Sequence, residues 1–196
     1  MSRLPCLVAP LAALALTACA DQPSEPLANT DAHAAHARLV EPSAELNRQL
    51  ATLRRATARF HDIDDAGAAG YTVLFDPDGA GPGSACLRLG DAAMGEHFVH
   101  PGLLFDGGAL DVAAPEALIY EPMRNGKYRL VAVEYVVPFS DVPSTATPPT
   151  LFGMDFMAND NPGFHLWALH VWVWRDNPDG IFAPWNANVT CQHSTN

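Results

Sequence analysis

Between Ser43 and His61, apolar residues recur every three or four positions, the spacing of one face of a helix. Ser43 can cap the first turn through its hydroxyl, and Glu45 places negative charge where the helix dipole favours it. We expect the helix to end near His61 and a second short helix to run from Asp62 to Gly70. The apolar stripe comprises Leu46, Leu50, Leu53, Thr57 and Phe60.

Beyond Tyr71 the pattern changes to short runs rich in β-branched and aromatic residues, which predict strands. Asn125-Gly126 lies between two of these runs and is a strong signal for a hairpin turn. A loop rich in Pro, Ser and Thr follows at residues 138–149, and Asn177 to Gly180 form a turn. The strand runs cover residues 71–75, 96–99, 117–120, 127–137 and 166–174.

These elements predict an α+β fold. We expect an N-terminal helix or helical hairpin to pack on a mainly antiparallel β-sheet. Residues 42–196 have the usual length of one domain, so we expect a single globular unit.

The chain before this unit has the pattern of an export signal. Residues 1–18 carry the basic residue Arg3 near their start, continue with an apolar run too short to span a bilayer, and end in small residues. Leu16-Thr17-Ala18-Cys19 resembles the bacterial lipobox, in which the cysteine is lipidated and becomes the new N-terminus. Residues 1–18 therefore predict a lipoprotein signal peptide and a membrane anchor on Cys19, and polar residues 19–41 predict a flexible tether.

The cleavage site leaves an alternative open. Ala18-Cys19-Ala20 also fits an ordinary signal peptidase site, which would release a soluble protein beginning at Asp21. For the lipidated form, Ala20 stands where aspartate would favour the inner membrane. We therefore expect an anchor in the outer membrane, facing the periplasm.

Charge narrows the classes of partner. Lys and Arg number 11 against 22 Asp and Glu, giving a formal net charge of −11. Such an acidic chain is poorly suited to nucleic acid, where neutralising phosphate dominates affinity. It also lacks a basic face for anionic lipid, so the lipid on Cys19 is the expected membrane contact, and we expect a monomer.

The four cysteines indicate which compartment to expect. Cys6 leaves with the signal and Cys19 carries the lipid, which leaves Cys86 and Cys191. Paired cysteines persist outside the cytoplasm. The sequence therefore predicts a disulfide between Cys86 and Cys191, with two free thiols as the alternative.

One acidic residue interrupts an apolar strand pattern. Successive side chains of a strand point to opposite faces, so Glu134 shares its face with apolar neighbours. Burying a carboxylate there costs free energy unless a partner offsets it. The expected neighbours on that face are Tyr128, Leu130, Ala132 and Val136. By the same rule His170 shares a face with Leu166, Ala168, Trp172 and Trp174.

We expect His97, Glu134 and His170, one from each of three strands, to converge on one face of the sheet. Two imidazoles and a carboxylate with open positions suit a divalent metal such as zinc or iron. In the alternative, Glu134 makes a structural contact with His170 or Arg129, and His97 caps a loop. His100 follows His97 at a metal-ligand spacing, but the flanking residues argue against the helix that this spacing requires.

Several stretches resemble an uncharacterised group of bacterial exported proteins. They are residues 60–64, 68–71, 94–97, 121–122, 133–135, 169–172, 177–180 and 185–186. The resemblance extends from about Arg59 to Cys191. It implies a single exported domain and brings no activity or substrate with it.

Two functional hypotheses follow from the sequence. The first is a lipid-anchored exported protein with a small metal- or ligand-binding site at His97, Glu134 and His170, whose metal would activate water or oxygen if the protein is an enzyme. The second is a non-enzymatic cell-envelope protein whose aromatic face binds a partner or a cell-wall component. That face would comprise Trp167, Trp172, Trp174 and Trp185. The sequence assigns no catalytic residue.

Overall fold

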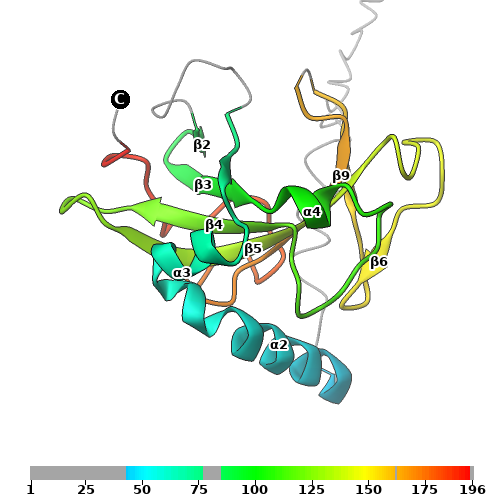
Figure 1. Ribbon diagram of the computed structural model, residues 1–196, viewed down its shortest axis with the longest axis horizontal. Coiled ribbons are helices and arrows are strands. Elements are labelled where there is room, and N and C mark those ends of the chain that lie inside the picture. Colours follow the sequence, from blue (N-terminus) through cyan, green and yellow to red (C-terminus); the bar gives the residue numbers. More distant parts are fainter. Residues whose placement is uncertain (1–42, 77–84, 162, 195–196) are drawn as a thin grey trace, which may run out of the picture.

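The computed structural model describes residues 43–76, 85–161 and 163–194 (Figure 1). These residues form the expected α+β fold, with helices near the N-terminus and a mainly antiparallel sheet. The signal peptide, Cys19 and the tether lie outside the described residues. Among the helices that are described, none is long and apolar enough to cross a membrane.

The N-terminal helices follow the sequence pattern closely. Helix α2 (Ala44–Thr57) is capped by Ser43, whose side chain accepts a hydrogen bond from the Leu46 amide at 3.0 Å. The 3₁₀ helix η1 (Ala58–His61) continues it, and α3 (Ile63–Ala68) begins where the Asp62 side chain accepts from the Asp64 amide. The predicted apolar stripe is buried along its whole length.

Seven strands form the main sheet, and every pairing in it is antiparallel. The order is β1-β3-β4-β5-β9-β8, and β2 pairs with β3 beside β1. The strands are β1 (Val73–Leu74), β2 (Cys86–Leu89), β3 (Ala92–Val99), β4 (Ala117–Pro122), β5 (Tyr128–Pro138), β8 (Met157–Asn159) and β9 (Leu166–Val171). A separate pair comprises β6 (Thr150–Leu151) and β7 (Met154–Asp155).

The predicted hairpin joins β4 to β5. The Gly126 amide donates to the Met123 carbonyl at 2.9 Å, and the Met123 amide donates to Lys127 at 2.8 Å. Gly126 has a φ of 74°, a backbone conformation that glycine adopts without a steric penalty. The two strands that this turn connects form the centre of the sheet.

Helices α2 and α3 cover one face of the sheet, which we call the helix face (Figure 1). We call the opposite face the cavity face. The core of the helix face joins the α2 stripe to alternate residues of the strands: Leu118, Tyr120, Leu130, Val133, Tyr135, Val137, Trp167, Leu169 and Val171. The cavity face carries a smaller apolar cluster: Ala93, Ile119, Val131, Ala132, Trp172 and Val189.

A bulge in β5 corrects one part of the sequence prediction. Ile119 pairs with Ala132 and Tyr120 pairs with Leu130, so Val131 is an extra residue with no partner on β4. The alternation of β5 side chains between the two faces of the sheet therefore shifts by one residue at Val131. The expectation that Tyr128 and Leu130 share the face of Glu134 is wrong, because both pack on the helix face.

Strand β9 ends three residues earlier than the sequence pattern predicts. After Val171 the chain leaves the ladder, and the Trp172 amide donates to the carbonyl of Ile181. Trp174 is consequently not on the face of His170. Its ring packs against the helix-face core, and its Nε1 donates to the Thr57 hydroxyl at 3.2 Å.

Cys86 and Cys191 form the predicted disulfide, with a sequence separation of 105 residues. It joins the start of β2 to the C-terminal segment. An isolated bridge between Ala93 and Asn186 brings the preceding part of that segment against β3. Both links hold late residues of the chain beside the first strands of the sheet.

Helix α4 (Pro101–Leu104) is a single turn that follows β3. His100 caps it, because its Nδ1 accepts from the Leu103 amide at 3.2 Å. The His100 ring also meets Tyr71 edge-on. His100 is therefore a structural residue at the end of β3, and the capping role considered for His97 belongs to it.

Candidate metal centre

Strands β3, β5 and β9 of the antiparallel sheet bring His97, Glu134 and His170 together. Glu134 and His170 are directly paired across β5 and β9. His97 lies on β3, separated from β5 by β4, where its pair is Ile119. Small and β-branched residues occupy the intervening positions of β4, so the long side chains of β3 and β5 can meet above it.

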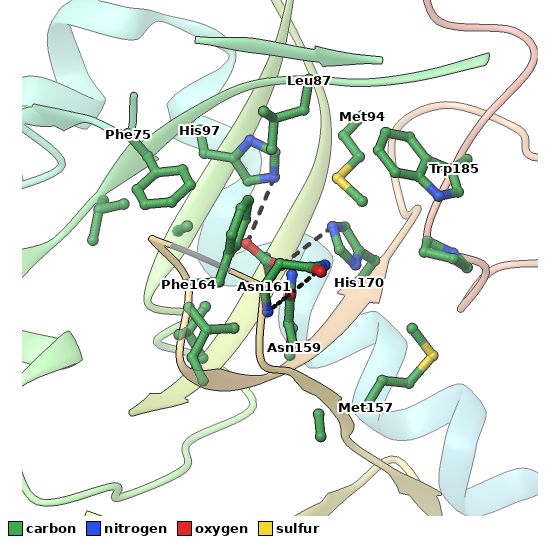
Figure 2. Close-up of a pocket in the computed structure, with 18 of the residues that line it drawn as sticks. Phe75, Leu87, Met94, His97, Met157, Asn159, Asn161, Phe164, His170 and Trp185 are labelled. Atoms are coloured by element: carbon green, nitrogen blue, oxygen red, sulfur yellow. Dashed lines mark hydrogen bonds and ion pairs between the residues drawn. The ribbon is translucent and has the colours of Figure 1, made fainter. Parts of the chain in front are cut away.

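The three side chains offer ligand atoms that all lie within 4.8 Å of one another. Nε2 of His97 is 3.6 Å from Oε2 of Glu134, and Nε2 of His170 is 3.2 Å from Oε1 (Figure 2). Both imidazoles thus point at the same carboxylate, one at each oxygen. Among the residues that the structure describes, no other group of three or more His, Cys, Asp or Glu side chains is arranged in this way.

The contacts between these side chains are poor hydrogen bonds. The His97 separation of 3.6 Å exceeds the hydrogen-bond range, and the His170 separation of 3.2 Å lies at its long end. Nε2 of His170 is buried and has no aligned hydrogen-bond partner within the described part of the chain. The three polar groups therefore converge on one point without forming well-aligned hydrogen bonds to one another.

Burial sets the protonation of the group. His97 and His170 are 2% and 5% exposed, and burial lowers the pKa of His97 to about 4 and that of His170 to about 3. Burial also raises the pKa of Glu134 to about 8, and the nearby Glu116 adds to this. Near neutral pH both imidazoles are uncharged, the form that coordinates metals.

Glu116 is a second buried carboxylate close to the site. It is 1% exposed, and its Oε2 accepts a hydrogen bond from the Val136 amide at 3.0 Å. Burial raises the pKa of Glu116 to about 8. No sequence pattern indicated Glu116, because it immediately precedes β4 and lies outside every alternating run.

The three side chains lie at one side of a cavity of about 440 Å³ on the cavity face. Figure 2 shows His97 and His170 directed toward its interior, with aromatic and methionine side chains around them. The labelled residues of the lining are Phe75, Leu87, Met94, His97, Met157, Asn159, Asn161, Phe164, His170 and Trp185. Most of them are apolar, so the polar site lies within an apolar enclosure.

Other residues considered from the sequence have different roles. Arg129 pairs with Glu121 at 3.4 Å rather than with Glu134. Of the four tryptophans, Trp185 lines the cavity, whereas Trp167 and Trp172 are buried and donate their Nε1 hydrogens to backbone carbonyls. The expected tryptophan groove is therefore divided between the two faces of the sheet.

Sequence patterns did not indicate most of the cavity wall. Phe75 lies at the end of β1, Asn159 on β8 and Phe164 in the segment before β9. These segments are short and irregular, and they reach the cavity through pairings between distant parts of the chain. A strand-period analysis has no signal for such residues.

Comparison of the chain with protein-family models, with curated proteins and with solved structures finds no match.

Proposed function

We propose that this domain binds one divalent metal ion through His97, Glu134 and His170, and offers the remaining coordination positions to a small molecule in the cavity. The observation that carries the proposal is the convergence of three ligand atoms within 4.8 Å. Zinc bonds to imidazole and carboxylate are about 2.0–2.2 Å long, which at tetrahedral angles separates ligand atoms by about 3.3–3.6 Å. The His–Glu separations of 3.6 and 3.2 Å agree with this spacing.

The ligand set favours zinc or ferrous iron. Two imidazoles and one carboxylate are harder than the thiolates that select copper(I) and softer than the all-oxygen sites of magnesium and calcium. Three protein ligands leave positions open, as in catalytic zinc sites and in iron oxygenases. Zinc held in such a site would act as a Lewis acid on bound water, and ferrous iron would supply electrons to bound oxygen.

A purely structural contact explains the geometry less well. A contact kept for stability would satisfy its buried polar groups, because an unsatisfied buried group costs about 1–3 kcal/mol. Here Nε2 of His170 has no aligned partner in the described part of the chain, and Nε2 of His97 lies beyond hydrogen-bond distance of Glu134. A cation between the three side chains would bind Nε2 of both imidazoles and the Glu134 carboxylate together.

Metal analysis tests the proposal. Protein without an affinity tag is stripped with chelator, dialysed against zinc or, without oxygen, ferrous iron, and its metal content is measured. We expect one metal per chain, and about 10- to 100-fold or greater weakening in His97→Ala, His170→Ala and Glu134→Gln. His165→Ala is the matched control, because His165 is exposed and contacts Asp160 outside the site. The absence of bound metal, or equal affinity in all variants, would contradict the proposal.

We also propose that the domain is exported and anchored through a lipid on Cys19. The lipobox-like residues 16–19 support this, and the disulfide between Cys86 and Cys191 agrees with an oxidising compartment. Mass spectrometry of the mature N-terminus is the test. An acylated Cys19 is expected, and a free Asp21 would contradict the anchor while leaving export intact.

A further inference from the structure

The cavity combines a polar floor with walls that are almost entirely apolar. We infer that it binds a small aromatic carboxylate, with the carboxylate on the metal and the ring among the aromatic and methionine side chains. This inference rests on the metal site proposed above and adds the chemical class of its ligand. Charge, wall chemistry and size each support it.

Charge favours an anion. Two neutral imidazoles and one carboxylate leave a divalent metal with a net charge of +1, and a low-dielectric enclosure disfavours an unbalanced charge. Among the described residues that line the cavity, Glu134 is the one acidic residue, and its charge would be committed to the metal. Arg88 also lines the cavity and is basic. An anionic oxygen on the metal is therefore attracted, although the whole chain is acidic.

The walls favour an aromatic body. Phe75 and Phe164 meet edge-on with ring centroids 5.3 Å apart, and Trp185 lines the cavity as well. Edge-to-face contacts with a further ring are favourable beyond the area that they bury. Met94 and Met157 add polarisable sulfur atoms, which contact aromatic rings well. A sugar or another polar ligand would find few partners on these walls.

Size limits the ligand to a small molecule. A volume of about 440 Å³ is near the lower end of the range, about 300–1,000 Å³, that small-molecule sites occupy. The side chains of Asn159 and Asn161 contribute polar groups to the lining and are joined by a hydrogen bond of 3.0 Å. The lining therefore has a few polar groups in an apolar surface, as sites for small organic ligands do.

The test uses the full domain loaded with cobalt(II), whose visible absorption reports a change of ligands at the metal. The metal content of each sample is measured first. Phenylacetate, acetate, phenethyl alcohol and phenethylamine are then titrated separately. We expect phenylacetate to bind on the order of 10- to 100-fold more tightly than acetate, because its ring is buried. The neutral alcohol should bind more weakly than phenylacetate, and the cationic amine should not bind.

A matched pair of variants locates the ring. Phe164→Ala removes part of the cavity wall and should weaken the binding of phenylacetate about tenfold without changing acetate affinity or metal content. Phe105→Ala is the control, because Phe105 is 72% exposed and does not line the cavity. Its affinities should equal those of the unmodified protein.

The outcomes separate the two proposals. Stoichiometric metal with equal affinity for phenylacetate and acetate would overturn the aromatic-carboxylate inference and leave the metal site standing. Preferential binding of phenethyl alcohol or phenethylamine would also overturn it. A protein that takes up no metal contradicts the proposed function and this inference together.

Discussion

The helix face and the cavity face alternate along the same strands, yet they treat buried polar groups differently. On the helix face, Tyr71, Tyr120 and Tyr135 each donate a hydroxyl hydrogen to a backbone carbonyl at 2.7–2.9 Å. On the cavity face, Nδ1 of His97 and Nε2 of His170 are buried without a hydrogen-bond partner among the residues that the structure describes. One face is complete as a core, whereas the other retains polar groups that still need a partner.

This contrast indicates which side of the sheet provides stability. Satisfied polar groups and close packing stabilise a fold, whereas unsatisfied groups beside a cavity cost free energy and persist where they have another use. We therefore expect substitutions on the helix face to change stability, and those on the cavity face to change binding. Four predictions test this division, in order of decreasing effect.

The largest effect is expected from opening the helix-face core. Leu53 is fully buried between α2 and the sheet, so Leu53→Ala should lower the free energy of unfolding by about 2–5 kcal/mol. Leu166→Ala is the matched change at the cavity, where the side chain is half-buried and already borders open space. Leu166→Ala should lower the free energy of unfolding by no more than about 1 kcal/mol. Chemical denaturation measures both, and equal losses would contradict the division.

Removing the disulfide should have the next largest effect. The bond between Cys86 and Cys191 closes a loop of 105 residues and holds the C-terminal segment beside β2. The Cys86→Ala/Cys191→Ala double variant should lose about 2–4 kcal/mol of stability. Reduction of the unmodified protein should reproduce this loss, and an unchanged melting temperature after reduction would count against it.

Zinc should stabilise the protein through Glu134. At a free concentration about 100 times its dissociation constant, a ligand that binds only the folded state adds about 2.7 kcal/mol to the free energy of unfolding. Glu134→Gln should abolish this gain and leave the metal-free protein at least as stable, because it removes a buried carboxylate. In the control, Glu121→Gln, loss of the contact with Arg129 should lower stability but preserve the response to zinc.

The last prediction is a pH dependence that arises from Glu116, which is the smallest effect when it is compared over a single pH unit. Burial raises its pKa from 4.5 to about 8, so the folded state holds a proton that the unfolded state has released. This contribution to stability is complete below about pH 4.5 and is lost as pH rises toward 8, by on the order of 1 kcal/mol per pH unit. Glu116→Gln should remove it. Parallel pH profiles of the metal-free protein and the variant would contradict this assignment.

Local signals were sufficient to predict the helices and the central hairpin. Each of these signals acts on its immediate neighbours in the chain. In the structure Ser43 and Asp62 cap helices, and Asn125-Gly126 forms a turn. The disulfide was also predictable, because the expected signal peptide and lipid anchor account for the other two cysteines and leave Cys86 and Cys191 as a pair. These predictions need no knowledge of which strands pair.

Errors arose where pairing between distant segments decides the structure. The extra residue Val131 exists only relative to β4, so a single strand pattern cannot reveal the bulge that moves Leu130 to the helix face. Strand β2 and strands β6 to β8 are two to four residues long, too short for a period to be recognised. Trp174 was assigned to the wrong face because β9 ends at Val171.

The candidate site could be predicted from the sequence for one physical reason. Glu134 interrupts an apolar strand, and a buried carboxylate needs a partner, which led to His97 and His170 on other strands. Their spacing to within 4.8 Å required the register of β3, β4, β5 and β9. The walls of the cavity were not predictable. Phe164 and Trp185 come from segments without a regular pattern, and Phe75, at the end of a predicted strand, is brought to the cavity by the pairing of β1 with β3.

Anomalous diffraction from a crystal of the zinc-loaded protein tests the central claim most directly. The account predicts one anomalous peak per chain among Nε2 of His97, Nε2 of His170 and the Glu134 carboxylate, about 2.0–2.2 Å from each ligand atom. At least one further position should face the cavity. A structure with zinc bound elsewhere, and with Glu134 simply hydrogen-bonded to His170, would contradict it.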